Sequence, residues 1–311
     1  SEMCIRDSTM IVINKIENFR LAKSVVALGK FDGVHLGHQQ ILQELKRDKT
    51  EDVKTVIITF SISPEAVLTH KKLRYIMTDK EKQDYFEACG IDYLIDIPLD
   101  EKFLAVEAED FVRIYLKEKL GAVKIVCGRN FHFGKGRRGN VDMLEQLGRT
   151  YGFEMKLVDH VMEDEEIISS TRIRQELLLG NIGHANKMMG HAYAISGVVM
   201  HGNALGRTID FPTVNLIPAE DKILPPNGVY GTEIEFDGIR KRGITNVGRK
   251  PTVETGRQIN VETNIFDFSG DLYGQAVTVY FHEFIRPEVK FGSLEELKDQ
   301  IRHDVDLWKQ G

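Results

Sequence analysis

The chain has 311 residues, enough for about two domains, and a formal net charge of −6 from 41 basic and 47 acidic side chains. Its 42% hydrophobic and 28% charged residues exclude a disordered or collagen-like chain. The acidic balance disfavours a protein that binds long nucleic acid through bulk charge, and without an apolar run of about 18 residues no membrane partner is expected.

Residues 1–9 match no element that follows and lack the charged and then apolar pattern of a secretory signal. We expect them to be a non-native extension, with Met10 as the natural start. Three scattered cysteines are too few for a disulfide framework or a four-cysteine zinc site. They favour a reducing, cytoplasmic location.

Short apolar runs alternate with amphipathic segments from Met10 to about Gly180. The runs predict strands at residues 24–29, 53–60, 91–97, 122–127 and 154–158. Helical spacing predicts helices at 34–47, 78–90 and 109–121. This alternation predicts a parallel sheet with helices on its faces. The acidic run at 159–166 is expected to be a solvated loop.

The pattern changes after a predicted helix–turn–helix at residues 170–190. From 193 to about 280, β-branched and alternating segments broken by Gly, Asn and Pro predict an antiparallel barrel or sandwich. A last helix follows, with Ser293 and Glu296 in capping-box spacing. The predicted fold is therefore α/β followed by β, with a domain boundary near residues 182–191.

The first predicted strand runs into Gly-Lys-Phe-Asp-Gly-Val-His-Leu-Gly-His, residues 29–38. Glycines at a strand-to-helix turn let backbone N–H groups approach a ligand, and a helix N-terminus attracts anions. His35 and His38 are three residues apart, so on a helix they share one face and can hydrogen-bond phosphoryl oxygens. Two surface histidines or half a zinc site are the alternatives, but no third zinc ligand is evident nearby.

Two later segments offer similar chemistry. Residues 168–174, Ile-Ser-Ser-Thr-Arg-Ile-Arg, combine helix-start hydroxyls with two arginines, which suits a polyphosphate, although ordinary N-capping would also explain them. Residues 128–139 interleave basic and aromatic side chains directly after a predicted strand. A ligand loop at the carboxyl edge of the sheet is favoured over a surface loop or a single-stranded nucleic acid site.

The barrel-like half contains His-Gly-Asn-Ala-Leu-Gly-Arg at 201–207 and Phe-Pro-Thr-Val-Asn at 211–215. Its glycines allow backbone donors to surround phosphates. Thr213 and Asn215 are two residues apart, so on a strand both oxygens face one side, where they suit Mg²⁺ shared with ATP. A β-turn rich in Gly, Pro and Asn is the alternative.

Residues 29–38 resemble the signature of the HxGH nucleotidyltransferases, in the form found in bacterial bifunctional riboflavin kinase/FAD synthetases. The resemblance implies a Rossmann-like FMN adenylyltransferase domain over residues 10–184. It implies that His35 and His38 handle the ATP phosphates. The further residues that it implies are Gly29, Phe31, Asp32, Ser170, Thr171, Arg172 and Arg174 for ATP, and Asn130 and Phe133 for the flavin.

Residues 206–215 are similar to the riboflavin kinase motif of the same family, and the resemblance covers the chain from Met10 to Trp308 in order. It implies an antiparallel β-barrel kinase domain over residues 185–311. Glu262 would be the general base on the flavin ribityl hydroxyl. The ATP contacts implied are Gly202, Gly206 and Arg207, and the Mg²⁺ contacts are Thr213 and Asn215.

The resemblance implies two activities: phosphorylation of riboflavin by ATP to FMN and ADP, and adenylylation of FMN by ATP to FAD and pyrophosphate. Three positions depart from the family pattern, namely Ser63, Asn130 and Asp210. They suggest an alternative, a partly degenerate flavin- or nucleotide-binding protein with one inactive domain. An RNA-binding role for residues 128–139 is disfavoured by the net charge. The sequence does not indicate an oligomeric state.

Overall fold

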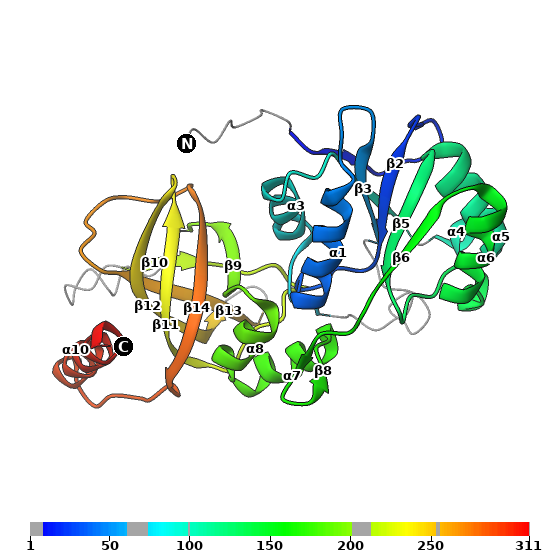
Figure 1. The fold of residues 1–311 in the computed structure, drawn as a ribbon. Helices are drawn as coiled ribbons and strands as arrows, with labels where there is room; N and C mark the ends of the chain where they lie inside the picture. Colours follow the sequence, from blue (N-terminus) through cyan, green and yellow to red (C-terminus); the bar gives the residue numbers. More distant parts are fainter. Residues whose placement is uncertain (1–8, 61–73, 99, 201–212, 253–255, 311) are drawn as a thin grey trace. The chain divides into compact units, whose positions relative to one another are not determined.

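The computed structural model describes residues 9–60, 74–98, 100–200, 213–252 and 256–310, without the side chains of residues 249–258 and 310. The chain forms two compact units (Figure 1). The first contains residues 79–169 and the part of the chain before residue 74. The second contains Ser170–Gly311 together with the short segment Arg74–Thr78.

The first unit is built on a parallel six-stranded sheet with the order β1-β4-β3-β2-β5-β6. In register, Ala27 of β2 lies between Ile57 of β3 and Val126 of β5. All five residues of β2 are buried, as expected for a central strand that is covered on both faces. The strand bounds are β1 Ile11–Ile13, β2 Ser24–Leu28, β3 Lys54–Phe60, β4 Tyr93–Ile97, β5 Ala122–Gly128 and β6 Glu154–Val158.

Helices cover both faces of this sheet. Helix α1 packs over β2, β5 and β6 through Ile41, Leu42 and Leu45 (Figure 1). On the core side that holds Val26 and Leu28, the π-helix η1 and α6 contribute apolar side chains. The helices are α1 Leu36–Arg47, α3 Asp79–Ala88, α4 Glu101–Leu104, α5 Ala108–Asp110, η1 Phe111–Lys119, η2 Lys135–Arg137 and α6 Val141–Tyr151.

The second unit is an antiparallel sheet with the order β10-β13-β12-β11-β14-β9. Just after β9, Met200 forms an antiparallel bridge with Asn215 of β10, which brings the two edges of the curled sheet together. Its strands are β9 Tyr193–Val198, β10 Thr213–Leu216, β11 Gly228–Phe236, β12 Ile239–Thr252, β13 Gly256–Ile265 and β14 Ala276–Arg286. Both the predicted parallel sheet and the predicted antiparallel barrel are therefore confirmed.

Three helices belong to the barrel unit: α7 Ser170–Leu179, α8 Ile182–Met189 and α10 Leu294–Gln310. Helix α8 packs on β14 and β9, and Asn186 donates to the carbonyl of Phe281, so the helix pair is part of the second unit. Before α10, the amide of Glu296 donates to the Ser293 hydroxyl and the Glu296 carboxylate accepts from the amide of Gly292. The predicted cap of the last helix is thus present.

The acidic run at 159–166 is exposed, as predicted, but it is not all loop. The acidic run predicted as a solvated loop contains a short hairpin, β7 Met162–Glu163 and β8 Glu166–Ile167. Asp164 and Glu165 both have positive φ, 51° and 64°, as a two-residue hairpin turn of the favoured twist requires. The acidic composition signalled exposure, but it did not reveal the strand pairing.

Candidate active sites

The first pocket lies where three parallel strands of the first unit end. Strands β2, β5 and β6 each end in pocket-lining residues, and the strand order reverses between β2 and β5. Such a reversal opens a crevice at the carboxyl edge of a parallel sheet. The pocket, called here the histidine pocket, measures about 200 Å³ and is lined by Leu28, Gly29, His35, Gly37, His38, Ile41, Gly128, Asn130, Phe131, Val158, Asp159, His160 and Val161.

The turn between β2 and α1 has an unusual backbone. Phe31, Gly33 and Val34 have φ of 52°, 78° and 33°, in the left-handed region. Only glycine adopts it without cost, and a β-branched valine there is rare. Because Phe31 and Val34 are fully buried, tertiary packing holds this strained turn in place. Helix α1 then begins at Leu36, two residues later than the predicted helix, with His35 as its N-cap and no acidic residue in its first turn.

The two histidines form a stacked pair. Their ring centroids are 3.7 Å apart, with 23° between the planes. Behind them, the Phe31 ring lies 5.1 Å from His38 and 5.6 Å from Phe86 of α3. A Cβ on Gly37 would lie 3.2 Å from the His35 ring, so the glycine between the histidines makes room for the stack. Sequence reasoning missed Phe86, whose only signal was its place on the apolar face of a predicted helix.

Burial keeps both imidazoles neutral near pH 7. Desolvation lowers the pKa of His35 to about 4. Desolvation, and then the nearby His35, lower the pKa of His38 well below its usual value. The Nδ1 atom of each ring is buried without a hydrogen-bond partner among the described residues, and neither Nε2 atom is buried in this way. Both rings line the histidine pocket.

Some of the other residues predicted for the first site line the histidine pocket, and others do not. Gly29 lines the pocket, and Asp32 is buried in the turn beside it. Asn130 also lines the pocket, but Phe133 is buried against Phe111, and its neighbour Phe131 lines the pocket instead. Phe131 is thus a pocket residue that sequence reasoning missed.

Helix α7 begins at Ser170, so the predicted residues Ser170, Thr171, Arg172 and Arg174 occupy its first turns. This helix belongs to the second compact unit, whereas the histidine pair belongs to the first. The expectation that the two motifs meet around one ATP stays a prediction.

In the barrel, the sheet register assembles a row of polar side chains. Asn215 of β10 is the direct cross-strand partner of Glu262 on β13, and Asn246 of β12 is the partner of Glu262 on its other side. Asn260 Nδ2 lies 2.9 Å from both Asn215 Oδ1 and Glu262 Oε1. Val261 is fully buried in the core, so alternation along β13 puts the side chains of Asn260 and Glu262 on the opposite face.

One pocket adjoins this row, and a second pocket shares Thr213 with the first. The larger, the barrel pocket, measures about 580 Å³ and is lined by Thr213, Val229, Ile244, Asn246, Glu262, Asn264, Arg286, Glu288, Val289, Lys290, Phe291, Leu297, Ile301 and Asp304. Arg286 makes a double hydrogen bond to the buried Asp304 carboxylate, which ties α10 to β14 beside this pocket.

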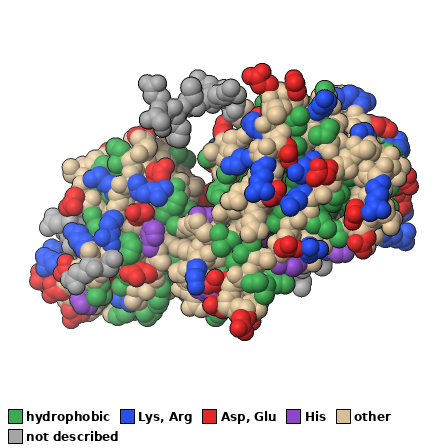
Figure 2. Space-filling view, in the orientation of Figure 1, with side chains coloured by type: hydrophobic (Ala, Val, Ile, Leu, Met, Phe, Trp, Pro, Cys, Tyr) green, Lys and Arg blue, Asp and Glu red, His purple; other side chains and the backbone are tan. Residues whose placement is uncertain are grey.

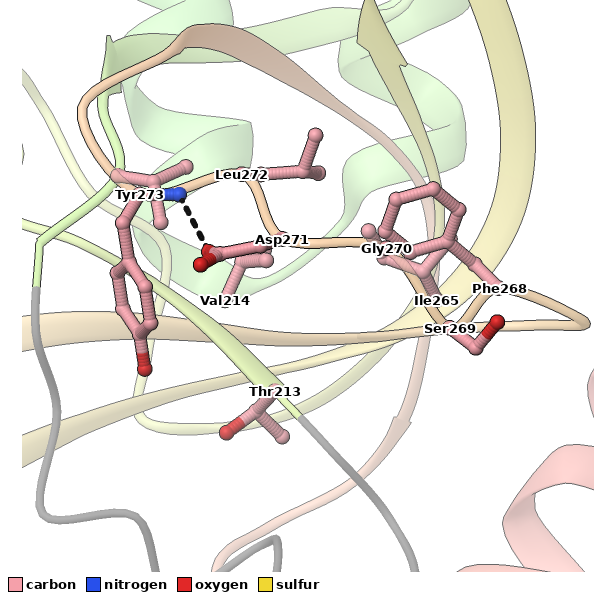
Figure 3. Close-up of a pocket in the computed structure, with 10 residues that line it drawn as sticks. Thr213, Val214, Ile265, Phe268, Ser269, Gly270, Asp271, Leu272 and Tyr273 are labelled. Carbon is pink, nitrogen blue, oxygen red and sulfur yellow. Dashed lines mark hydrogen bonds between the residues drawn. The ribbon is translucent and has the colours of Figure 1, made fainter.

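The smaller aromatic pocket measures about 310 Å³ and shares Thr213 with the barrel pocket. In Figure 3 the rings of Phe268 and Tyr273 lie on opposite sides of Asp271, whose carboxylate accepts from the amide of Tyr273. Gly202, Gly206, Arg207 and the departure Asp210 lie outside the described residues, as does Ser63. Of the residues predicted for the kinase site, the structure describes Thr213, Asn215 and Glu262. Asn215 pairs with Glu262, and Thr213 lines the barrel pocket together with Glu262.

Comparison with known proteins shows two families along the chain. A model of FAD synthetase matches residues 18–172, and a model of riboflavin kinase matches residues 189–310. The bifunctional riboflavin kinase/FMN adenylyltransferase of Escherichia coli K12 is 36% identical over 95% of this chain and 96% of its own length. The chain belongs to this bifunctional family.

Other relatives of the riboflavin kinase/FMN adenylyltransferase family agree. The Bacillus subtilis enzyme is 37% identical over 91% of this chain and 90% of its own length. A solved Streptococcus pneumoniae structure named a macrolide-efflux protein has a TM-score of 0.87 at 32% identity, covering 97% of this chain and 99% of that one. Its name states a transport function, whereas both family models and the curated relatives state flavin chemistry.

Riboflavin kinase and FMN adenylyltransferase activities are both present, and the alternative of a degenerate binding protein is not favoured. The substrates that fit these activities are riboflavin, FMN and ATP, and the products are FAD, ADP and pyrophosphate. Among the described residues, no helix combines the length and apolar composition needed to cross a membrane. Figure 2 shows basic and acidic side chains interspersed on the visible face of both units.

Proposed function

We propose that the two reactions use separate pockets: adenylyl transfer in the histidine pocket, within residues 10–184, and riboflavin phosphorylation beside Glu262, within residues 185–311. The observation that carries this proposal is that the histidine pair lies in one compact unit and the Asn215–Glu262 pair in the other. His35 stacks on His38 in one. Asn215 pairs with Glu262 in the other.

In the histidine pocket, neutral imidazoles serve as hydrogen-bond donors. With the proton on Nε2, each ring presents one N–H to the pocket, where the α1 N-terminus adds backbone donors and a favourable dipole. Such donors stabilise charge that builds on phosphoryl oxygens while the FMN phosphate attacks the α-phosphorus and pyrophosphate leaves. The protein itself forms no covalent bond in this step. Gly29, Phe31 and Asp32 shape the nucleotide side of the pocket, and Asn130 with Phe131 or Phe133 its flavin side.

In the barrel, the apolar lining of the larger pocket suits the flavin ring, and Glu262 beside it takes the proton of the ribityl hydroxyl. The aromatic pocket suits the adenine of ATP because Phe268 and Tyr273 offer ring faces. Thr213 lines both pockets, so the transferred phosphoryl group would pass beside it.

The oxygens of Thr213 and Asn215 fit Mg²⁺, which prefers hard oxygen ligands and commonly shares its coordination with ATP phosphates. Asn215 is buried and its amide oxygen is already oriented by Asn260. When bound, the ion neutralises phosphate charge. The role of Gly202, Gly206 and Arg207 on the phosphates, and that of α7 residues 170–174 on the adenylyltransferase ATP, belong to the same proposal.

Replacing the carboxylate tests this assignment. Glu262→Gln keeps the shape of the side chain but removes the proton acceptor, so FMN formation from riboflavin should fall about 10²–10⁴-fold. FAD formation from supplied FMN should stay at the wild-type rate. The matched control is Glu283→Gln, an exposed glutamate of β14 outside both barrel pockets, which should change neither rate. An unaffected kinase rate in Glu262→Gln would remove Glu262 from its role.

We also propose that the enzyme works in the cytoplasm on free small molecules rather than on nucleic acid or a membrane. Support comes from the net charge of −6 and from two free cysteines, Cys89 and the buried Cys127. Strongly salt-dependent RNA binding by the full chain would contradict the exclusion of nucleic acid.

A further inference from the structure

One amide group connects the two most important polar side chains of the proposed kinase site. Asn260 Nδ2 lies 2.9 Å from the amide oxygen of Asn215 and 2.9 Å from a carboxylate oxygen of Glu262. The –NH₂ group of asparagine carries two hydrogens, so one nitrogen can donate to both oxygens at once. Asn260 and Glu262 share a face of β13 because they are two residues apart.

The chemistry fixes the direction of both bonds. An ionised carboxylate only accepts hydrogen bonds, so Asn260 must turn its –NH₂ group toward Glu262. Asn215 must then turn its Oδ1 toward the same nitrogen. The orientation of each side chain in the row thus follows from the charge on Glu262.

Without the –NH₂ group of Asn260, the facing positions of Asn215 and Glu262 would be unfavourable. Asn215 and Glu262 face each other across an antiparallel strand pair, where side chains are about 4.5–5.5 Å apart at Cβ. An amide oxygen and a carboxylate oxygen that turn toward each other across such a pair repel each other. The bridging –NH₂ group turns the repulsion into two hydrogen bonds.

We propose that Asn260 is a positioning residue for riboflavin phosphorylation, which holds the proposed base Glu262 and the proposed metal ligand Asn215 in register through a single bridging amide. This inference rests on the proposed roles of Glu262 and Asn215. Glu262 lines the larger barrel pocket and Asn260 does not, so we place Asn260 behind the side chains that it orients.

The test uses the full-length protein with Asn260→Ala, which removes the amide, Asn260→Asp, which keeps its size but cannot donate, and Asn260→Gln. We expect kcat for FMN formation to fall about 10–100-fold in the first two, the usual effect of losing a partner that orients a ligand. KM for riboflavin should stay unchanged, and Asn260→Gln, which retains a donor, should recover part of the rate. FAD formation from supplied FMN reports correct folding and should not change.

A second readout does not depend on turnover. Mn²⁺ binding to the ADP complex, followed by electron paramagnetic resonance, should weaken about 10-fold in Asn260→Ala because Asn215 loses its orientation. Asn181→Ala is the matched control. Asn181 also donates to a carboxylate, that of Glu176 at 2.7 Å, but outside both barrel pockets, and its loss should affect neither readout.

The double variant Asn260→Ala/Glu262→Gln separates this inference from the proposal beneath it. The comparison is made at saturating Mg²⁺, where weaker metal binding through Asn215 no longer limits the rate. If Asn260 then acts through Glu262, the double variant should be about as slow as Glu262→Gln alone. Losses that multiply, or a wild-type kcat in Asn260→Asp, would overturn the inference while leaving Glu262 as the base. If Glu262→Gln itself retains the wild-type rate, the proposed base is wrong. Unchanged Mn²⁺ binding in Asn260→Ala would then also overturn the proposal that Asn260 orients Asn215.

Discussion

At the scale of single residues, the histidine pocket depends on two imidazoles that burial keeps neutral. Neutral rings stack at 3.7 Å without the repulsion that two imidazolium ions would feel. They still have one N–H donor each, which is enough to contact a phosphoryl oxygen. Their electrostatic effect is therefore that of oriented dipoles rather than of fixed positive charges.

Removing one of these donors should affect one reaction only. His38→Ala should lower FAD formation from FMN about 10²–10³-fold, the usual scale for one group that stabilises charge in a transition state. FMN formation from riboflavin should continue at the wild-type rate, because Glu262 and Asn215 belong to the other unit. Chromatographic separation of riboflavin, FMN and FAD measures both rates, and an equal loss of both would count against separate sites.

The lowered pKa of His35 also predicts how stability depends on pH. Above about pH 6.5 the ring is neutral in both the folded and the unfolded chain, so its titration does not change stability there. Between about pH 6.5 and 4 the unfolded chain binds a proton that the folded chain does not, and folding is weakened. Relative to His35→Gln, the wild type should lose up to about 3 kcal/mol of unfolding free energy across this range. Urea unfolding at several pH values measures the difference, and parallel curves would contradict it.

At the scale of elements, both candidate sites lie where two elements meet. The sequence predicted where these elements are, but it did not predict their local geometry. The apolar runs predicted all the central strands, and the glycine- and histidine-rich segment after β2 marked the pocket. The three left-handed residues of that turn had no sequence signal at Phe31 or Val34, because their conformation is imposed by packing. The pairing of Asn215 with Glu262 depends on strand register, which spacing along one strand does not determine.

The first turn of α1 offers a test of this local geometry. A methyl group added at Gly37 would lie 3.2 Å from the His35 ring, closer than an ordinary contact, so the imidazole would have to shift within its stack. Gly37→Ala should therefore lower FAD formation about 10-fold or more, since small displacements at reacting groups are costly, while α1 itself gains helix propensity. Gly183→Ala in α8 is the control, because a Cβ there meets nothing within 4 Å. Unchanged FAD formation in Gly37→Ala would contradict a fixed stack.

At the scale of the whole molecule, the two compact units are not two continuous stretches of the chain. The segment Arg74–Thr78 comes from the first half of the chain but packs in the barrel unit. Tyr75 exchanges backbone hydrogen bonds with residues 221–223, and the buried Lys222 donates to the carbonyl of Ile76 at 2.7 Å. Sequence patterning, which is local, could not predict this long-range contact.

The contact of this segment with Lys222 should be detectable in solution. Lys222→Met keeps the length and apolar stem of the side chain but leaves the Ile76 carbonyl without this donor, which should destabilise the barrel unit by about 1–3 kcal/mol. Hydrogen exchange at the amide of Ile223, which donates to Tyr75, should become faster. Unchanged exchange there would show that Lys222 does not hold the segment.

The proposal of two independent pockets is tested most directly by mixing two full-length variants that each lack one of the two activities. Full-length His38→Ala and Glu262→Gln are each incubated with riboflavin, ATP and Mg²⁺, and then together in equal amounts. Alone, His38→Ala should accumulate FMN and Glu262→Gln should leave riboflavin unchanged, whereas the mixture should form FAD as FMN passes through solution from one protein to the other. A mixture that forms no FAD, although its partners are folded, would contradict the assignment of the two reactions to separate pockets.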